Sequence, residues 1–375
     1  MTTLTQLIEQ YCPDGVEHVE LKEVLKYEQP GKYLVSSTDY DDGFSTPVLT
    51  AGKTFVLGYT DETTGIYEAS PDDPVIIFDD FTTSFKWVDF PFKAKSSAMK
   101  MLTPTVVDSS FRYIFYAMHD VDVDVTDHKR QWIRTYSKEK IPLPPREVQD
   151  AIVERLDAFA KLIQSLDSEI ALREKQFEYF REQLLTFDES DGVEYVKLGN
   201  VGQMLMCKRI FKRETAEHGD VPFFKIGTFG KEPDAFISRA LFDEYRNKFS
   251  YPRKGELLIS ASGSIGRIVE FDGQDAYYQD SNIVWLRHDE SRLLNRFLKH
   301  CYAEVEWYTE GGTIKRLYGK NLHNTVVPLP TLEVQQDIAD KLDTMQALID
   351  NLKQERELRK SQFEYYREKL LTFNS

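Results

Sequence analysis

Cysteine and long apolar runs are both scarce in this chain. Only three cysteines occur among 375 residues, Cys12, Cys207 and Cys301, and no two of them form a C-x-x-C pair. Such a set argues against a disulfide framework and against a zinc site. No run of about eighteen apolar residues is present, and the polar opening MTTLTQLIEQYC lacks the basic start of a signal peptide. We therefore expect a cytoplasmic protein.

Positive charge is also in deficit. The net charge of -15 argues against a protein that simply coats nucleic acid, because phosphate binding usually leaves a basic footprint. Two stretches are nevertheless locally basic, Met206–Glu214 and Gly312–Lys320. The negative net charge therefore does not exclude a local groove that binds nucleic acid. With 41% hydrophobic residues, the chain can bury ordinary cores and should form two or three domains.

Motifs for catalysis or metal binding are incomplete. LTAGKT (Leu49–Thr54) resembles the end of a phosphate-binding loop, but Pro47 stands where that loop needs a glycine. Asp120–Asp127 begins like a calcium loop, yet Val125 and Gln131 replace its glycine and closing glutamate. Alternating acid and valine fits a half-buried strand better. The seven histidines show no ligand spacing, and we expect neither a bound metal nor catalysis by this chain.

Glycine and proline are missing from two long segments that repeat each other. Neither residue occurs from Arg146 to Phe187 or from Thr331 to Phe373, which permits two helices of roughly 60 Å at about 1.5 Å per residue. A P-L-P element precedes each segment and marks a helix start. The segments end in QFEYFREQLLTF and QFEYYREKLLTF.

Apolar residues recur in both segments at steps of three and four, close to the period of a coiled coil. We predict that the helices pack on each other as an antiparallel spacer, since a globular helix averages only about eleven or twelve residues. The alternative is that each helix packs on its own domain. The seam weakens at Arg173 and Arg359. The predicted seam residues are Val148, Ile152, Leu156, Phe159, Ile163, Leu166, Phe177, Phe180, Leu184, Val334, Ile338, Leu342, Met345, Ile349, Leu352, Phe363, Tyr366 and Leu370.

The repeat continues outside the helices. DGVEYVKLGNV (Asp191–Val201) matches DGVEHVELKEV (Asp14–Val24), so the start of the chain resembles the continuation of its own end. The two inserts between the repeats have diverged, although Val75–Phe90 can be laid on Glu256–Phe271 as strand, turn and strand. We also align Arg134 with Arg316, with a short insertion before the second P-L-P.

We therefore predict an α+β protein. Its parts are an N-terminal insert domain (1–141), a central long helix (142–187), a second insert domain (188–326) and a C-terminal long helix (327–375).

With LIEQYCPDGVEHVELKEV, the doubled helix and the divergent inserts, the chain resembles the DNA-specificity subunit of type I restriction-modification systems. The resemblance implies two target-recognition domains of similar α/β fold in a pseudo-twofold arrangement, each reading one half of a bipartite double-stranded DNA site. It implies docking of two methyltransferase (modification) subunits and of restriction endonuclease/translocase subunits. S-adenosylmethionine, ATP and Mg would belong to those partners. A coiled-coil adaptor and an acidic DNA-mimic inhibitor are the alternatives.

Candidate DNA contacts are basic or hydroxyl residues in turns of the two inserts, since such side chains bind phosphates and base edges. Solvated surface charge and plain hairpin turns are the competing interpretations. The first insert contributes Thr82, Thr83, Ser84, Lys86, Arg134, Tyr136 and Lys138. The second contributes Lys208, Arg209, Lys212, Arg213, Ser262, Ser264, Arg267, Arg316, Tyr318 and Lys320.

Overall fold

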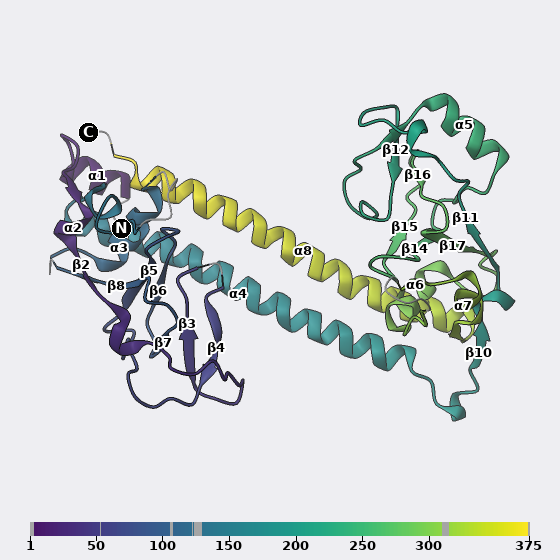
Figure 1. Cartoon of the computed structure of the whole chain (residues 1–375), viewed down its shortest axis with the longest axis horizontal. Helices are drawn as coiled ribbons and strands as arrows, with labels where there is room; N and C mark the ends of the chain where they lie inside the picture. Colours follow the sequence, from purple (N-terminus) through teal and green to yellow (C-terminus); the bar gives the residue numbers. More distant parts are fainter. Residues whose placement is uncertain are drawn as a thin grey trace. The chain divides into compact units, whose positions relative to one another are not determined.

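The chain forms two compact units, each of which takes part of both long helices (Figure 1). The computed structural model describes residues 4–52, 54–105, 108–121, 123, 130–309 and 315–373. Unit 1 comprises residues 1–167 and 355–375, and unit 2 comprises residues 168–354. The long helices α4 (Arg146–Leu185) and α8 (Leu332–Leu371) fall inside the two segments predicted to be helical.

Unit 1 is built on a four-stranded antiparallel sheet of order β2-β8-β5-β6. A three-stranded sheet, β4-β3-β7, and the pair β1-β9 complete its strands. Its elements are α1 (Leu4–Tyr11), β1 (His18–Glu20), α2 (Leu21–Val24), β2 (Leu25–Glu28), η1 (Pro30–Tyr33), β3 (Thr46–Leu49), β4 (Val56–Thr60), β5 (Val75–Asp79), β6 (Phe85–Val88), β7 (Lys93–Ala94), β8 (Met99–Pro104), α3 (Phe111–Ala117), η2 (Met118–Asp120), η3 (Tyr136–Lys138) and β9 (Lys140–Pro142).

Unit 2 repeats this plan with sheets β11-β17-β14-β15 and β13-β12-β16 and the pair β10-β18. Its elements are η4 (Glu189–Asp191), β10 (Glu194–Lys197), η5 (Leu198–Asn200), β11 (Gln203–Met206), η6 (Lys212–Glu214), β12 (Val221–Phe224), β13 (Phe236–Ile237), α5 (Arg239–Lys248), β14 (Leu257–Ser260), β15 (Ile268–Glu270), β16 (Tyr277–Tyr278), β17 (Ile283–Arg287), α6 (Asn295–Glu304), α7 (Gly319–Asn324) and β18 (Val326–Leu329).

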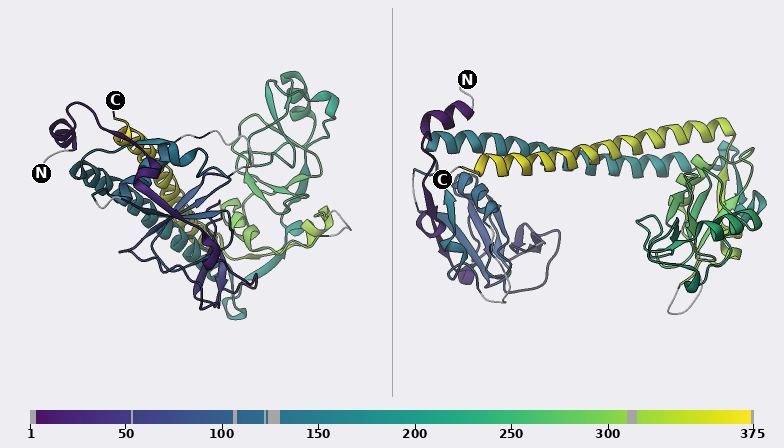
Figure 2. Two further views of the ribbon diagram at one scale, coloured as in Figure 1. Left: turned by 60° about the vertical axis from the view of Figure 1, so that its left-hand side comes forward. Right: turned by 90° about the horizontal axis from the view of Figure 1, so that it is seen from above.

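The two units therefore share one topology, strand for strand. In each three-stranded sheet the central strand pairs antiparallel with one neighbour and parallel with the other. The prediction of two α+β domains of similar fold is confirmed. Figure 2 lets the sheets of each unit be followed from two further directions.

The two long helices pack against each other in both units. In unit 1, Val148, Ile152 and Leu156 at the start of α4 share a core with Leu371 at the end of α8. Nearby, the rings of Phe159 and Tyr366 stack with centroids 5.4 Å apart. In unit 2 the opposite ends meet, since Phe177 and Leu185 of α4 share a core with Ile338, Leu342 and Ile349 of α8. The pairing is antiparallel, as predicted.

Each helix end also packs on the sheet and short helix of its unit, so the alternative interpretation holds alongside the pairing. The core of unit 1 contains Ile76 of β5 and Tyr113 of α3 together with Ile152. Leu4 of α1 lies in that same core as Leu371. The predicted continuity between the end of the chain and its start is therefore seen in the packing.

Three predicted seam residues are partly exposed and not fully buried. Val334 lies in the first turn of α8, outside the core of unit 2, and is 39% exposed. Phe180 is 44% exposed and lines an open groove together with Leu184 of α4 and Met345 of α8. Tyr366 is 41% exposed although it stacks on Phe159.

The weakened middle of the seam is polar. Arg173 bonds Glu169 on its own helix, and Arg359 does the same with Glu355. Between helices, Lys353 pairs with Glu174 at 2.6 Å in unit 2, and Arg356 pairs with Asp167 at 3.1 Å in unit 1. Such exposed ion pairs contribute little stability, so the apolar ends carry the helix packing.

Two buried glutamines join the long helices to their domains, and the apolar pattern did not reveal them. Gln149 accepts from the backbone N–H of Ser110, the residue before α3, and donates to the carbonyl of Pro144. Gln335 accepts from the N–H of Leu294, the residue before α6, and donates to Pro330. Each amide thus ties the P-L-P element and a short helix to the same point of a long helix.

Asp157 and Asp343 form a second pair of matching attachments. In unit 1, Arg112 and Tyr116 of α3 both bond Asp157 of α4. In unit 2, Arg296 and His300 of α6 bond Asp343 of α8, each at 2.8 Å. In each unit, equivalent polar contacts thus attach the short helix of the domain to a long helix.

Replacing Gln335 by alanine should destabilise unit 2. The change leaves the N–H of Leu294 and the carbonyls of Arg292 and Pro330 without their partner, which should cost roughly 2–4 kcal/mol of unfolding free energy. Urea denaturation of each variant measures this change in unfolding free energy. The neighbouring Gln336 is exposed, and its side chain donates to the exposed Asp340, so Gln336→Ala should change the value by less than about 0.5 kcal/mol. Equal effects of the two changes would contradict the assigned role of Gln335.

Candidate nucleic-acid interface

The turn between β14 and β15 in unit 2 is a hydroxyl-rich hairpin closed by its own side chains. The hydroxyl of Ser260 donates to the carbonyl of Ser264 at 2.5 Å and accepts from the N–H of Arg267 at 2.8 Å. Gly263 and Gly266 take left-handed φ values of +64° and +83°, which glycine adopts without strain. Ser264 is exposed at the tip, as the prediction requires, while the guanidinium of Arg267 donates to the carbonyl of Phe229.

Three of the predicted segments meet at residues 280–282, which sequence reasoning did not single out. The hydroxyl of Ser262 donates to Oδ1 of Asn282 at 2.9 Å. Arg316 donates to the same oxygen at 2.8 Å and to the hydroxyl of Ser281 at 2.9 Å. Arg209 forms an ion pair with Asp280 at 2.8 Å. Residues far apart in the sequence thus form one polar cluster on unit 2.

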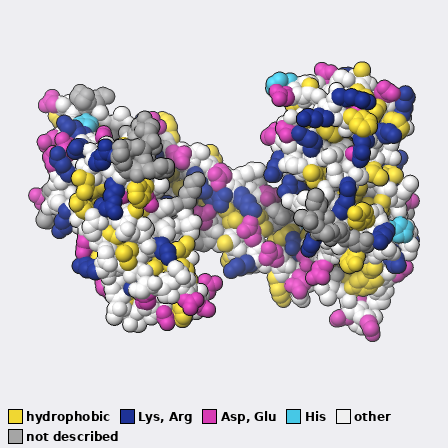
Figure 3. Space-filling model, in the orientation of Figure 1, with side chains coloured by type: hydrophobic (Ala, Val, Ile, Leu, Met, Phe, Trp, Pro, Cys, Tyr) yellow, Lys and Arg dark blue, Asp and Glu magenta, His cyan; other side chains and the backbone are white. Residues whose placement is uncertain are grey.

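The basic stretch beside this cluster is exposed. Lys208 lies over the ring of Phe249, with Nζ 5.2 Å from its centroid, and Arg213 lies over Phe211 at 5.3 Å. Arg209 and Lys212 are exposed as well. Further Lys and Arg side chains appear on the part of unit 2 around α5 in Figure 3. Cations next to exposed aromatic rings suit a surface that meets phosphates and bases.

The corresponding hairpin of unit 1 lies between β5 and β6. One carboxylate oxygen of Asp79 accepts the N–H groups of Phe81 and Thr82, each at 2.9 Å, and the hydroxyls of Thr82 and Ser84 bond at 2.6 Å. Thr83 takes a left-handed φ of 59°, which is uncommon for a β-branched residue and marks a constrained tip. Lys86 follows in β6 and is half-buried.

Beneath this hairpin the chemistry of unit 1 differs from that of unit 2. The backbone N–H of Asp80 donates to the carbonyl of Ala98, as that of Ala261 does to Asn282. Asp80 is fully buried and pairs with buried Lys100 at 2.8 Å, where unit 2 has the neutral Ala261. Equivalent backbone positions thus carry unlike side chains.

The predicted alignment of Arg134 with Arg316 is wrong. The N–H of Gln131 donates to Asp80 and that of Leu317 to Ala261, so Gln131 and Leu317 are equivalent. Leu317 follows Gln131 by the same number of residues as the start of α8 follows the start of α4. The second unit therefore has no insertion between Leu317 and its long helix. Arg316 is therefore equivalent to Arg130. Tyr136 is equivalent to Leu322, and Tyr318 is equivalent to Trp132. The two tyrosines predicted to share a role thus occupy different positions of the repeat.

Tyr136 is accordingly a core residue, contrary to its predicted place among the surface contacts. Its ring packs on Phe78 and Trp132, and its hydroxyl donates to the carbonyl of Met118 at 2.9 Å. Tyr318, in contrast, is 46% exposed. Arg134, Lys138 and Lys320 are exposed, which is compatible with the predicted DNA contacts.

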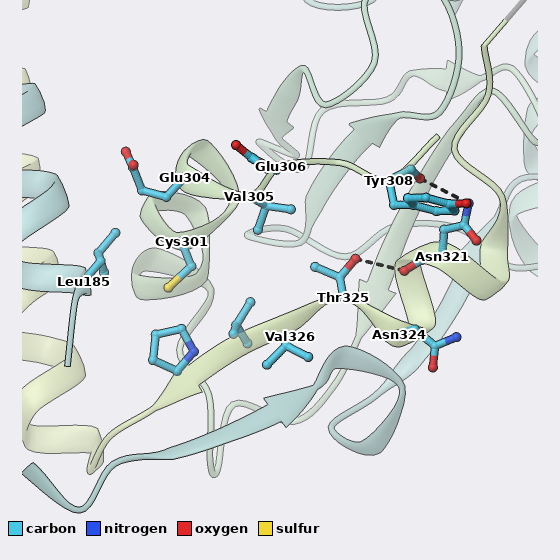
Figure 4. A pocket seen from close by; sticks show the side chains of 12 residues that line it. Leu185, Cys301, Glu304, Val305, Glu306, Tyr308, Asn321, Asn324, Thr325 and Val326 are labelled. Atoms are coloured by element: carbon cyan, nitrogen blue, oxygen red, sulfur yellow. Dashed lines mark hydrogen bonds between the residues drawn. The ribbon is translucent and has the colours of Figure 1, made fainter. Parts of the chain in front are cut away.

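A hollow beside α6 and α7 of unit 2 offers no activated nucleophile. It measures about 600 Å³ and is lined by Cys301, Glu304, Tyr308 and Asn321, among others (Figure 4). Burial raises the pKa of the Cys301 thiol far above its usual value, so the thiol stays protonated. The neighbouring His300 has a pKa lowered mainly by burial, and its ring bonds Asp343.

The described part of the chain lacks both a cluster of metal ligands and a membrane-spanning helix. No three His, Cys, Asp or Glu side chains gather there as metal ligands would. No helix there is long and apolar enough to cross a bilayer. The calcium-loop-like segment Asp120–Asp127 lies mostly outside the described residues, and Lys53 of LTAGKT lies outside them.

The fold and the two unlike hairpin surfaces define a two-domain recognition protein on a repeated helical frame. The family model described as the type I restriction modification DNA specificity domain matches residues 13–172 and again 190–359. The chain belongs to this family.

Individual relatives agree with that assignment. The chain is 38% identical over 394 residues to the EcoR124I/EcoR124II specificity subunit of Escherichia coli, covering 96% of this chain and 95% of that one. It is 49% identical over 247 residues to a putative type I restriction enzyme specificity subunit of Haemophilus influenzae. That second match spans 62% of this chain and 64% of the relative.

Solved structures share the fold. The crystal structure of a type I restriction-modification S subunit from M. genitalium superposes with a TM-score of 0.61 at 13% identity, covering 96% of this chain and 97% of that one. A chain from a study of complex assembly and conformational transition in the type I R-M system gives 0.55 at 19% identity, with the same coverage.

Gly266→Ala should disturb the unit 2 hairpin more than Gly263→Ala. Both glycines have positive φ, so both changes introduce backbone strain. A Cβ at Gly266 would also come within 2.4 Å of the Trp307 indole nitrogen, whereas at Gly263 the nearest atom, on Ile226, is 3.5 Å away. We expect an extra loss of about 1–3 kcal/mol for Gly266→Ala and altered tryptophan fluorescence. Indistinguishable variants would show that Trp307 does not rest on the hairpin.

Proposed function

We propose that this chain is the sequence-specific DNA-binding subunit of a type I restriction-modification complex and recognises a bipartite duplex site. Unit 1 would read one half and unit 2 the other. The observation that carries the proposal is the repeated fold with unlike hairpin surfaces, one built over the buried Asp80–Lys100 pair and the other beside the polar cluster at Asn282. The family and the relatives named above support it.

The acidic total charge is compatible with this role because the candidate contacts are local. Lys208, Arg209, Lys212 and Arg213 stand together on unit 2 and are exposed. Phosphate contacts of this kind would position the duplex, while side chains of the hairpins and of residues 280–282 would face base edges. Family membership disfavours the adaptor and the DNA-mimic inhibitor.

We further propose that the outward faces of the long helices dock two copies of one methyltransferase subunit. Each unit exposes the same apolar set at matching positions of the repeat. Unit 1 presents Leu162, Leu358, Tyr365 and Tyr366, and unit 2 presents Leu348, Leu172, Tyr179 and Phe180. Tyr179 and Tyr365 are each 58% exposed. A surface that occurs twice suits two identical partners related by a twofold axis, and exposed apolar groups of this size can serve as interaction sites.

Catalysis would then belong to the partners, with the chain itself contributing recognition and assembly. We propose that S-adenosylmethionine, ATP and Mg are bound by the methyltransferase and endonuclease/translocase subunits. The thiol of Cys301 in the hollow of unit 2 is protonated, and the neighbouring His300 is engaged by Asp343, which is consistent with this division.

Selection from random duplexes, with the methyltransferase subunit present, tests the recognition proposal. We expect two short, unlike motifs at one fixed separation, bound with an affinity that falls steeply as salt rises. Enrichment of a single contiguous motif, or of none, would contradict the proposal.

Substitution of the two equivalent tyrosines tests the docking proposal. Tyr179→Glu or Tyr365→Glu alone should reduce the bound methyltransferase from two copies to one, and the double change should abolish binding, because a buried carboxylate without a partner is costly. Native mass spectrometry counts the copies. Tyr195 of β10 is similarly exposed at 51%, and Tyr195→Glu should retain two. Full binding by the double variant would refute this surface.

A further inference from the structure

Asn282 occupies the centre of the polar cluster in unit 2, at the point where the chain enters β17. Its carbonyl accepts the N–H of Ala261, which fixes its backbone to the hairpin strand. Its side-chain oxygen accepts both from Ser262 and from Arg316. The residue before it, Ser281, has a φ of 50°, a left-handed conformation that costs free energy in a non-glycine residue and often occurs at functional sites.

The orientation of the Asn282 amide follows from the chemistry of its partner. A guanidinium group can only donate hydrogen bonds, so the amide atom 2.8 Å from Nη2 of Arg316 must be the oxygen. The amide nitrogen therefore points away from both Arg316 and Ser262. This fixes which end of the side chain is presented outward.

The Nδ2 group of Asn282 is open to a ligand. Within the described ranges it has no hydrogen-bond partner, and it is not among the buried polar atoms that lack one. The group therefore retains some solvent-accessible surface. An amide held at its oxygen by two donors has lost most of its freedom, so a ligand that accepts from Nδ2 pays little further ordering cost.

Arg316 adds an uncompensated positive charge to the same cluster. Its described hydrogen-bond partners are the carbonyl and hydroxyl of Ser281 and the amide of Asn282, all neutral, and among the described residues no carboxylate pairs with it. The charge of Arg209 is only partly offset, since its side chain is 61% exposed beside Asp280. The cluster thus favours an anionic ligand that carries acceptors, as a duplex does.

We propose that Asn282 is a base-reading residue of unit 2 that donates from Nδ2 to an acceptor on a base edge, with Ser262 and Arg316 as positioning residues. The proposal rests on the proposed DNA-recognition function. In the major groove guanine, adenine and thymine each present an acceptor, whereas cytosine presents only its N4 amino donor. Asn282 therefore discriminates against cytosine at the base that it faces.

The effect should be confined to one half of the site. The equivalent position in unit 1 is Ala98, whose carbonyl accepts from Asp80 in the same way. Alanine has no group that could donate to a base. A substitution of Asn282 should therefore leave the motif read by unit 1 unchanged.

Asn282→Asp is the sharpest test, because it replaces the Nδ2 donor by an acceptor of the same size. Selection from random duplexes with the assembled complex should show discrimination against cytosine at one position of one half-site reduced by roughly ten-fold or more, the scale of a single base contact. Cytosine or adenine, whose amino groups donate, should gain there. Every other position should keep its preference.

Two further variants make the outcome decisive. Asn247 is exposed on α5, and Asn247→Asp changes the net charge equally but should leave the motif intact. Ser262→Ala removes one of the two donors that hold the amide, so it should weaken preference at the same position as Asn282→Asp while binding persists. An unchanged motif in both Asn282→Asp and Ser262→Ala would overturn the inference.

The inference and the proposed function fail in different ways. If the unsubstituted protein selects two unlike motifs and the Asn282 and Ser262 variants select the same ones, base reading by Asn282 is wrong and DNA recognition stands. If the unsubstituted protein selects no bipartite motif, the proposed function itself is wrong, and the inference falls with it.

Discussion

The antiparallel packing of α4 against α8 within each unit is the interaction on which the rest depends. Apolar side chains carry it at both ends, such as Ile152 with Leu371 and Phe177 with Ile349. The same helix surfaces hold the domains through Gln149 and Gln335 and through Asp157 and Asp343. Because these contacts recur in both units, the hairpin surface of either domain can change in sequence while the domain stays attached to the long helices.

Much of this frame could be predicted from the sequence, since the 3.5-residue period and the absence of glycine and proline define two long paired helices. The buried glutamines could not. A polar residue among charged ones carries no sign of burial until its backbone partners are known, and those of Gln335 lie at Arg292 and Leu294. The prediction that Val334 lies in the seam failed for the opposite reason, because an apolar residue in the first turn of a helix need not reach the core.

The candidate site was predictable only in part. Hairpin turns and basic stretches are visible as sequence patterns, and Ser262, Arg209 and Arg316 do meet. Their meeting point at 280–282 arises from the sheet order, which places β17 beside β14. Matching Tyr136 to Tyr318 by residue type failed because backbone pairing, not letter identity, sets equivalence. The result is one tyrosine in the core and the other on the surface.

The two hairpin surfaces show how one fold can present different chemistry. In unit 1 a buried charge pair lies beneath the turn, and such a pair tolerates loss of neither partner. In unit 2 the same backbone position is filled by alanine, and the polar groups are displaced to Asn282, directly before β17, and to Arg316. The backbone bonds from Asp80 and Ala261 are retained. Divergence is therefore tolerated where side chains face the turn, while the hydrogen bonds that fix the turn to the sheet persist.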